Sequence, residues 1–369
     1  MKRLLLLGGG HAHLHVLSAL ARAPIADVET VLVSPYPRFI YSGMLPGWVA
    51  GHYPLDACMV DLEALCVRAR CELRQSKAVA LDAPVRVVQC ADGASVTYDV
   101  LSIDTGPETD LSAIDGAARH ALPLRPLQGF VSGWQQIIAA RTGNAGTVAV
   151  VGGGVGGVEL ALAMRYRLLR EGLSPRAQVV LVSATAQILQ GQSPSLRRML
   201  TDELRKQDIS VVSGQAVTAV TALHLQLANG SIVPARHAIF ATGAAAPRWL
   251  SASGLATSAG GFIAIDECLR STSHHEVFAA GDVASMARHP RPKSGVYAVR
   301  AGPTLAANLR RALSQQPLVT HVPQKRALYL VSTGERHAVA AWGKLSWRGR
   351  WVWRWKDFID RRFVARYSG

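Results

Sequence analysis

Three histidines stand two residues apart near the start of the chain, directly behind three glycines. Residues 4–17 read LLLLGGGHAHLHVL, with His11, His13 and His15 at i, i+2 and i+4. This spacing brings three imidazoles together only on a strand, because on a helix His11 and His15 share a face and His13 points away. The glycines and the apolar residues behind them predict a helix from about residue 11. With two aligned imidazoles and no carboxylate nearby, the sequence predicts no metal site here.

The same residues have the pattern of a phosphate-binding turn. The four leucines form a strand, Gly8 and Gly10 form a tight turn, and the helix follows, as in the first unit of a dinucleotide-binding fold. The third glycine of G-x-G-x-x-G would fall where His13 stands. Lys2 and Arg3 resemble the start of a secretory signal, but the apolar run ends after four leucines, which favours a buried strand.

Composition and charge narrow the class of protein. The chain has 369 residues, 49% of them hydrophobic, and 33 glycines, which is typical of an α/β protein with two or three domains. No apolar run approaches the roughly 20 residues of a membrane-spanning helix. Five cysteines without a C-x-x-C pair favour a reducing compartment, so we expect a cytoplasmic location. The net charge of +15 favours anionic partners, but no nucleic-acid-binding motif accompanies it, and we expect no nucleic acid partner.

A second copy of the glycine motif begins in the middle of the chain. Residues 147–161 read TVAVVGGGVGGVELA and contain all three glycines, Gly152, Gly154 and Gly157. The first permits a tight turn, the second lets the backbone approach a pyrophosphate, and the third lets helix and strand pack closely. Each copy is followed by an apolar strand that ends in Thr-Gly, so the sequence predicts two units of the same kind. These pairs are Thr105 and Gly106, and Thr242 and Gly243.

Two further segments complete the pattern. Residues 276–284 read EVFAAGDVA, which places Asp282 just after a strand, and residues 293–309 read KSGVYAVRAGPTLAANL, a loop that opens a helix. The order of these motifs resembles the flavoproteins with two dinucleotide-binding domains, which include the pyridine nucleotide–disulfide oxidoreductases, type II NADH dehydrogenases and sulfide:quinone reductases. Residues 41–53 and 353–363 resemble more closely the NADH-dehydrogenase-like flavoprotein found alone or fused ahead of selenide, water dikinase. In that subgroup a histidine is expected at the third position of the first motif.

The resemblance implies an α/β fold with two Rossmann-like three-layer domains and a small C-terminal α+β cap. The FAD-binding domain would be discontinuous, comprising residues 1–112 and 246–318. The NAD(P)H-binding domain would be inserted at residues 113–245, and the cap would take residues 319–369.

In the resembling proteins the first motif holds FAD. Gly8, Gly10 and His11 would then lie beside the FAD pyrophosphate, and Asp282 would bind the ribityl chain. An acidic residue usually ends the second strand and binds the adenosine ribose, whereas this sequence has Ser34, a weaker partner. The resemblance assigns the other FAD contacts to Ser42, Gly43, Met44, Leu45, Pro46, Val79, Thr105, Gly106, Gly281, Ser294, Gly295 and Val296.

Two residues are expected to act beside the reacting rings. The helix that begins near Gly295 would point its N-terminus at the flavin and stabilise the reduced, anionic ring, and Lys293 would add positive charge there. Glu159 lies where the resembling proteins keep a glutamate near the nicotinamide. We therefore expect Glu159 and Lys293 to be the catalytic residues.

The second motif would bind NAD(P)H through Gly152, Gly154 and Gly157. Ser183 stands where NAD enzymes often carry an acid, and no arginine follows closely to hold a 2′-phosphate. The sequence therefore leaves the choice between NADH and NADPH open. Thr242 and Gly243 complete this predicted site.

The cysteines favour electron transfer without a dithiol. None falls in residues 41–48, where disulfide reductases carry their redox pair. Cys66 and Cys71 have the spacing of that pair, but they fall where a predicted helix at 61–66 meets a predicted strand at 72–82, which favours buried hydrophobic residues. Because Cys268 is the one cysteine of the second half, sulfide:quinone chemistry is not expected either.

The last residues of the chain combine aromatic and basic side chains. This composition is typical of an interfacial membrane anchor, which would place the protein on the inner face of the cytoplasmic membrane. It is equally typical of a hairpin (331–355) and a short helix (357–367) that pack on their own domain, with a cation–π ladder along the hairpin. Both interpretations stay open. The residues are Trp342, Trp347, Trp351, Trp353 and Trp355, with Lys344, Arg348, Arg350, Arg354 and Lys356.

The leading hypothesis is an FAD-dependent NAD(P)H dehydrogenase that passes a hydride from nicotinamide to flavin and the electrons to a quinone or another acceptor. The resemblance to the kinase-fused subgroup suggests an alternative, a flavoenzyme of selenium or sulfur metabolism with selenide, water dikinase as a candidate partner. The two missing acids motivate a third hypothesis, a flavin-binding interaction protein whose nicotinamide site has decayed.

Overall fold

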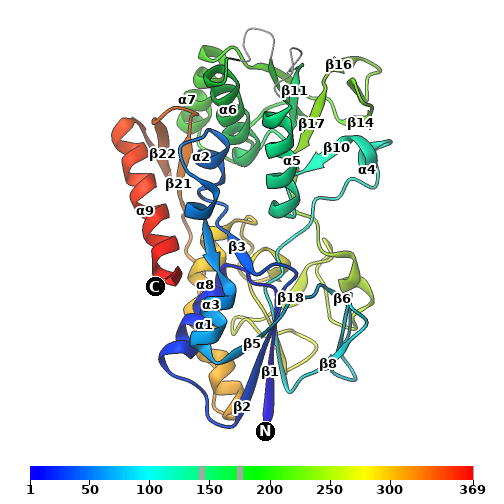
Figure 1. Cartoon of the computed structure of the whole chain (residues 1–369), viewed down its shortest axis with the longest axis vertical. Coiled ribbons are helices and arrows are strands. Elements are labelled where there is room, and N and C mark those ends of the chain that lie inside the picture. Colours follow the sequence, from blue (N-terminus) through cyan, green and yellow to red (C-terminus); the bar gives the residue numbers. More distant parts are fainter. Residues whose placement is uncertain (141–145, 173–177, 369) are drawn as a thin grey trace.

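The computed structural model describes residues 1–140, 146–172 and 178–368, and it shows two lobes, one above the other (Figure 1). Each lobe is built around a five-stranded parallel sheet. The lower sheet has the order β19-β9-β1-β2-β5. Its strands are β1 (Lys2–Leu7), β2 (Val28–Val33), β5 (Cys71–Arg74), β9 (Val100–Ile103) and β19 (Val277–Ala279).

The upper sheet repeats the lower one, with the order β10-β17-β11-β12-β13. The two orders correspond strand for strand: β17 takes the place of β9, β11 that of β1, β12 that of β2, and β13 that of β5. The two Rossmann-like units predicted from the glycine motifs are therefore confirmed strand by strand. The strands are β10 (Ala121–Pro123), β11 (Val148–Val151), β12 (Val179–Ser183), β13 (Ser210–Ser213) and β17 (His237–Phe240).

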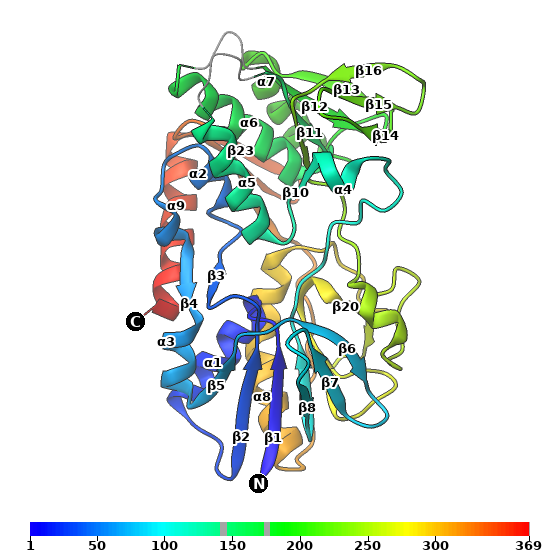
Figure 2. The ribbon, with the colours of Figure 1, turned by 45° about the vertical axis from the view of Figure 1, so that its right-hand side comes forward.

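Each parallel sheet lies between a layer of helices and an antiparallel meander (Figure 2), so the predicted three-layer arrangement is confirmed. In the lower lobe the helices are α1 (His11–Arg22), α3 (Leu62–Ala69) and α8 (Gly295–Leu313), and the meander is β6 (Ala78–Asp82), β7 (Val87–Cys90) and β8 (Ser95–Thr97). In the upper lobe they are α5 (Leu127–Ala139), α6 (Val155–Arg170) and α7 (Pro194–Lys206), with β14 (Val217–Val220), β15 (His224–Leu227) and β16 (Ile232–Pro234).

The uniformly apolar strands explain why the two motif strands lie inside the sheets. Leu4, Leu5, Leu6 and Leu7 of β1 are completely buried, and every residue of β11 is buried. A parallel sheet that is covered on both faces needs such runs rather than alternation. The shorter elements are α2 (Leu45–Val49), α4 (Ala117–His120), β3 (Arg38–Ile40), β4 (Met59–Asp61), β18 (Ile263–Ile265), β20 (Ala284–Met286), and the 3₁₀ turns η1 (Leu55–Cys58), η2 (Arg248–Ala252) and η3 (Gly281–Val283).

The C-terminal cap differs from the prediction. It is a three-stranded antiparallel sheet, β21 (Leu328–Ser332), β22 (Ala338–Trp342) and β23 (Leu345–Gly349), followed by a 19-residue helix, α9 (Arg350–Ser368). The predicted hairpin at 331–355 was therefore wrong in its last six residues, which belong to the helix. Alternating tryptophans resembled a strand, whereas the residues actually buried follow helical spacing. They are Val352, Trp353, Lys356, Asp360, Val364 and Tyr367.

The region around Cys66 is also divided differently from the prediction. Helix α3 continues to Ala69 and ends at Arg70, which has a left-handed φ of 52°, and the predicted strand at 72–82 is two strands, β5 and β6. Cys66 and Cys71 are both buried, as expected for small hydrophobic residues.

Helix α9 runs beside α2 and reaches down to α3 (Figure 1). Its contacts with β4 and η1 bring the end of the chain against the segment that follows the first motif. Across the described ranges, no helix is long and apolar enough to cross a membrane.

Candidate functional site

A cavity of about 440 Å³ opens between the two lobes. The carboxyl ends of β1, β2 and β9 form its floor, α8 begins at its edge, and α6 of the upper lobe closes its far side. The first glycine motif therefore lines this cavity, at the usual place for a ligand in an open α/β sheet, and the helix of the second motif reaches it through Gly156, Glu159 and Leu160. The predicted residues that line it are Gly8, Gly10, His11, Ser34, Ser42, Leu45, Pro46, Thr105, Gly106, Glu159, Asp282 and Gly295.

The remaining residues predicted for FAD lie next to this wall rather than in it. The Gly43 carbonyl faces the cap, Met44 is completely buried, and the side chain of Val79 is exposed while its neighbour Ala78 lines the cavity. Gly281, Ser294 and Val296 adjoin lining residues in the chain.

The first glycine turn suits a dinucleotide phosphate. Gly8 has a φ of +85°, and a β-carbon there would lie 2.5 Å from the α-carbon of Thr105, so only glycine fits this tight turn. The N-termini of α1 and α8 both open towards the cavity. Helix N-termini present N–H groups and a positive dipole end to an anion. The residues present therefore fit the phosphate of FAD.

His11 is a neutral imidazole in the cavity wall. Burial, with a smaller contribution from Arg125, lowers its pKa to about 4. Its ring lies against Phe39 and Tyr41, with centroid distances of 4.9 and 5.9 Å. Its Nε2 atom is buried and has no hydrogen-bond partner among the described residues. A buried polar atom without a partner is costly, so this nitrogen is free for a ligand.

His13 explains how the first motif works without its third glycine. Its Nδ1 donates to the Gly8 carbonyl at 2.6 Å, so its Nε2 accepts from the Ser102 hydroxyl at 2.8 Å. In the second motif a β-carbon on Gly157 would lie 1.9 Å from the Gly152 carbonyl oxygen. The first motif therefore has room at its third position for a side chain that the second motif excludes.

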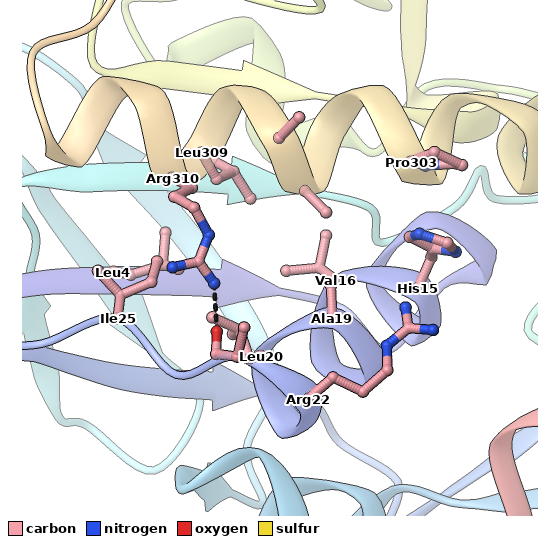
Figure 3. A pocket seen from close by; sticks show the side chains of 13 residues that line it. Leu4, His15, Val16, Ala19, Leu20, Arg22, Ile25, Pro303, Leu309 and Arg310 are labelled. Atoms are coloured by element: carbon pink, nitrogen blue, oxygen red, sulfur yellow. Dashed lines mark hydrogen bonds between the residues drawn. The ribbon is translucent and has the colours of Figure 1, made fainter.

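His15 points elsewhere, into a shallow hollow between α1 and α8 (Figure 3). This hollow, of about 370 Å³, has Arg22 beside His15 at one end and Arg310 at the other, where Arg310 donates to the Ala23 carbonyl. The three histidine rings thus lie in three different surroundings. In the part of the chain that the structure describes, no group of three His, Cys, Asp or Glu side chains is arranged to hold a metal ion.

Asp282 lies in the cavity wall and faces two basic residues. Burial raises its pKa, and Arg125 and Lys293 oppose this shift. Arg125 Nη2 lies 3.5 Å from Asp282 Oδ2. Lys293 sits behind the wall, where its ammonium donates to the Ala284 carbonyl and lies 3.8 Å from the centroid of the Phe262 ring. Burial lowers the pKa of Lys293 to about 8.

The second motif lies at the carboxyl ends of the upper strands. Gly152, with a φ of +136°, follows β11, and a β-carbon on Gly154 would meet nothing within 4 Å, which leaves room for a pyrophosphate. Ser183 ends β12, and its hydroxyl lies 2.9 Å from the Thr185 hydroxyl. Thr242 and Gly243 follow β17. These residues do not line the lower cavity, which the upper lobe reaches through the first turns of α6.

Glu159 belongs to a buried group of charges that joins α6 to the cap. Its Oε1 accepts from the Ser332 backbone N–H at 2.7 Å. Burial raises its pKa to about 7, and Lys356 opposes this shift. Lys356 donates to Asp360 at 2.7 Å and to the Gly43 carbonyl at 2.6 Å. Burial lowers the pKa of Lys356, but the carboxylates of Asp360 and Glu159 raise it further, so the ammonium stays charged.

The sequence analysis gave Arg125 and Asp104 no role, and it named Lys356 only as a basic residue of the C-terminal segment. Arg125 and Lys356 come from segments that are far in sequence from the motifs they contact, so no residue spacing could predict their part in the site. Asp104 could have been found from the sequence, because the two Thr-Gly strands read IDTG and FATG, with Asp104 in the place of Ala241.

Comparisons with known proteins agree with this architecture. The family described as pyridine nucleotide-disulphide oxidoreductase matches residues 2–302. An NADH dehydrogenase-like protein from Mycobacterium tuberculosis is 27% identical over 300 residues, covering 77% of this chain and 73% of that protein. A demethylphylloquinone reductase from Synechocystis is 27% identical over 235 residues, covering 61% and 57%.

Two solved structures share the fold. The sulfide:quinone oxidoreductase from Aquifex aeolicus has a TM-score of 0.82 at 19% identity and covers 100% of this chain and 92% of its own. The NDH2 from Plasmodium falciparum in complex with NADH has a TM-score of 0.78 at 15% identity and covers 99% and 98%. The family match spans most of the chain and both glycine cradles. The chain therefore belongs to the pyridine nucleotide-disulphide oxidoreductase family and is an oxidoreductase that uses FAD and NAD(P)H.

Proposed function

We propose that the protein oxidises NAD(P)H and delivers the electrons to a quinone. The observation that carries this proposal is a cavity lined by the first glycine motif and by the first turns of the helix that follows the second, in a chain without a cysteine at residues 41–48. FAD, when bound, takes up a hydride from nicotinamide and releases its electrons to an acceptor. The Mycobacterium relative is named NADH dehydrogenase-like and the Synechocystis relative is named a quinone reductase, which supports the same reaction.

The residues of the lower lobe hold the cofactor in this proposal. Gly8, Gly10 and His11 face the pyrophosphate, and the guanidinium of Arg125 offsets its charge. Asp282 accepts a hydrogen bond from a ribityl hydroxyl. The N-terminus of α8 at Gly295 places its positive end where negative charge develops on reduction, which favours the reduced form.

The second motif holds the nicotinamide nucleotide through Gly152, Gly154 and Gly157. Ser183 is a hydroxyl donor already engaged with Thr185, so neither an acid nor an arginine selects the nucleotide at this position. We therefore propose no preference of the protein between NADH and NADPH.

Glu159 moves a proton in this proposal. Reduction of a quinone to a quinol consumes protons, and a group with a pKa of about 7 can give and regain one near neutral pH. Glu159 lines the cavity, and the Lys356 ammonium stabilises its carboxylate after the proton has left. Lys293, behind Asp282, acts with Arg125 against the rise that burial causes in the pKa of that carboxyl.

The test uses holoprotein reduced with one equivalent of NADH and mixed rapidly with candidate acceptors. We expect fast reoxidation by a short-chain ubiquinone and none by oxidised glutathione. Reoxidation by polysulfide or polyselenide, with none by the quinone, would instead support the selenium and sulfur alternative and overturn the quinone proposal. The selenide, water dikinase partner is an expectation of that alternative alone.

A second proposal concerns the exposed large apolar side chains of the cap, which we call the aromatic row. Its members, Trp342, Leu345, Trp347, Trp351, Trp355 and Phe358, are each at least 38% exposed, whereas Trp353 is buried. Lys344, Arg348, Arg350 and Arg354 lie among them in the sequence. The described residues contain one cation–π contact to a cap tryptophan, Arg336 over Trp353 at 5.6 Å, rather than a ladder. We propose that the aromatic row binds an anionic membrane surface, at the inner face of the cytoplasmic membrane.

We expect the double variant Trp351→Ser/Phe358→Ser to bind phosphatidylglycerol vesicles about tenfold more weakly than the wild type, because two interfacial side chains are lost. Cosedimentation at low salt measures this. The control is Leu223→Ser/Ile232→Ser, which removes two equally exposed apolar side chains from the upper meander. A wild type that ignores these vesicles, or a control that loses as much binding, contradicts the proposal.

A further inference from the structure

The two halves of the chain differ at the third position of the glycine motif and at the residue before Thr-Gly. Where the second half has Gly157 and Ala241, the first half has His13 and Asp104. These two exceptions touch each other: the His13 N–H donates to Asp104 Oδ2 at 3.1 Å, and the Ala12 N–H donates to the same oxygen at 2.7 Å. Asp104 thus caps the helix of the first motif from the neighbouring strand.

The carboxyl of Asp104 is wedged between two glycines of the FAD site. A β-carbon on Gly10 would lie 2.4 Å from Asp104 Cγ, and a β-carbon on Gly281 would lie 2.5 Å from Asp104 Oδ1. At the matching place in the second motif, a β-carbon on Gly154 meets nothing within 4 Å. Asp104 lines the cavity and is 3% exposed, so the first cradle contains a carboxyl group that the second lacks.

Among the described residues, no cation pairs with this carboxyl. Oδ2 accepts from the two helix N–H groups, and within the described residues no donor reaches Oδ1. Of the groups facing it, His11 and His13 are neutral, and Arg125 is paired with Asp282. Lys293 donates to the Ala284 backbone carbonyl. Burial, and to a lesser extent Asp282, raise the pKa of Asp104 to about 8, although the two N–H groups oppose this.

We infer that Asp104 is a further FAD-binding residue that works in its protonated form, with Oδ2 accepting from the helix and the O–H on Oδ1 donating to an oxygen of the cofactor. An ionised carboxylate at this place would face the negative pyrophosphate in a buried site, which is costly. A protonated one offers a donor instead, like a neutral carboxylic acid kept in an apolar site. When the free protein carries the carboxylate, FAD binding therefore takes one proton from solvent and leaves it on Asp104.

The pH dependence has a definite sign. Below about pH 8 Asp104 already carries its proton in the free protein, so its titration does not make FAD affinity depend on pH in that range. Above that pH each further unit weakens FAD binding by up to about tenfold, because the proton must be taken up first. Loss of FAD at alkaline pH is the consequence.

The test measures FAD binding to the protein stripped of cofactor, from about pH 6.5 to about pH 9.5, by flavin fluorescence calibrated at each pH. We expect the wild-type dissociation constant to rise about fivefold from pH 8 to pH 9, and to approach about tenfold per unit above that. Asp104→Asn keeps an acceptor for the helix and a donor for the cofactor, so its dissociation constant should stay within about threefold over this range. The control is Glu108→Gln, which removes a carboxylate from the same cavity wall near Lys77. This variant should keep the wild-type slope.

A second measurement needs no variant. Calorimetric titration of the stripped wild type with FAD at about pH 8.5, in buffers of different ionisation enthalpy, should show uptake of more than half a proton, and Asp104→Asn should show none. Absence of proton uptake by the wild type, or parallel pH profiles for the wild type and Asp104→Asn, would overturn the inference.

Discussion

Replacing Gly157 with alanine is expected to slow reduction of the flavin by NADH by at least about 100-fold while FAD stays bound. The added β-carbon would lie 1.9 Å from the Gly152 carbonyl oxygen, an atom of the backbone that no side-chain rotation can move away. Helix α6 must therefore shift, and with it both the nucleotide cradle and Glu159 in the cavity wall. Because the first motif is untouched, the protein keeps its flavin. Stopped-flow bleaching of the visible flavin band measures the rate.

The matched control is Gly129→Ala in helix α5 of the same lobe, where a β-carbon meets nothing within 4 Å. This substitution adds helix propensity and should leave the reduction rate within about twofold of the wild type. Reduction of the Gly157→Ala protein at the control rate would contradict the assignment of the second motif to the nicotinamide nucleotide.

Replacing Lys356 with methionine is expected to lower the free energy of unfolding by about 3–5 kcal/mol. The Lys356 and Asp360 side chains are only 10% and 7% exposed, and their N–O distance is 2.7 Å. Loss of the ammonium leaves a buried carboxylate without its counter-ion and removes the donor to the Gly43 carbonyl. Because Gly43 adjoins residues of the cavity wall, we also expect weaker FAD retention. Urea unfolding of the holoprotein, compared with free flavin released, measures both effects.

A double variant separates the ion pair from the packing of α9. Lys356→Met/Asp360→Leu removes both charges and should recover most of the lost stability, since an apolar pair of similar volume is well tolerated in a buried place. Lys344→Met, the same substitution at an exposed position of the cap, should change the free energy of unfolding by less than about 0.5 kcal/mol. If Lys356→Met unfolds like Lys344→Met, the buried pair does not hold α9 in place.

The sequence predicted best those features whose residues are contiguous in the chain. A glycine turn, the strand before it and the helix behind it are contiguous, so both copies and both Thr-Gly strands predicted the two parallel sheets. The cap was harder to predict because residues 347–355 alternate tryptophans with other residues, as a strand does. The left-handed φ of Gly349, +147°, ends the last strand, and helical spacing of buried residues begins after it.

The charges of the site depend on contacts between distant segments. Asp360 accepts from Tyr41, which lies 319 residues away, and Arg125 reaches Asp282 across 157 residues. No spacing rule connects such pairs, because the fold alone brings them together. Asp104 is different, since a comparison of the two halves of the chain would have marked it. The domain boundaries at 112, 245 and 318 remain predictions.

The central claim is that one cavity lets a nicotinamide nucleotide reduce a bound flavin. Anaerobic titration of the yellow holoprotein with NADH, and separately with NADPH, tests this most directly. We expect complete bleaching of the flavin band by about one equivalent of at least one nucleotide. A flavin that dithionite bleaches but neither nucleotide reduces would contradict the account and favour a flavin-binding interaction protein with a decayed nicotinamide site.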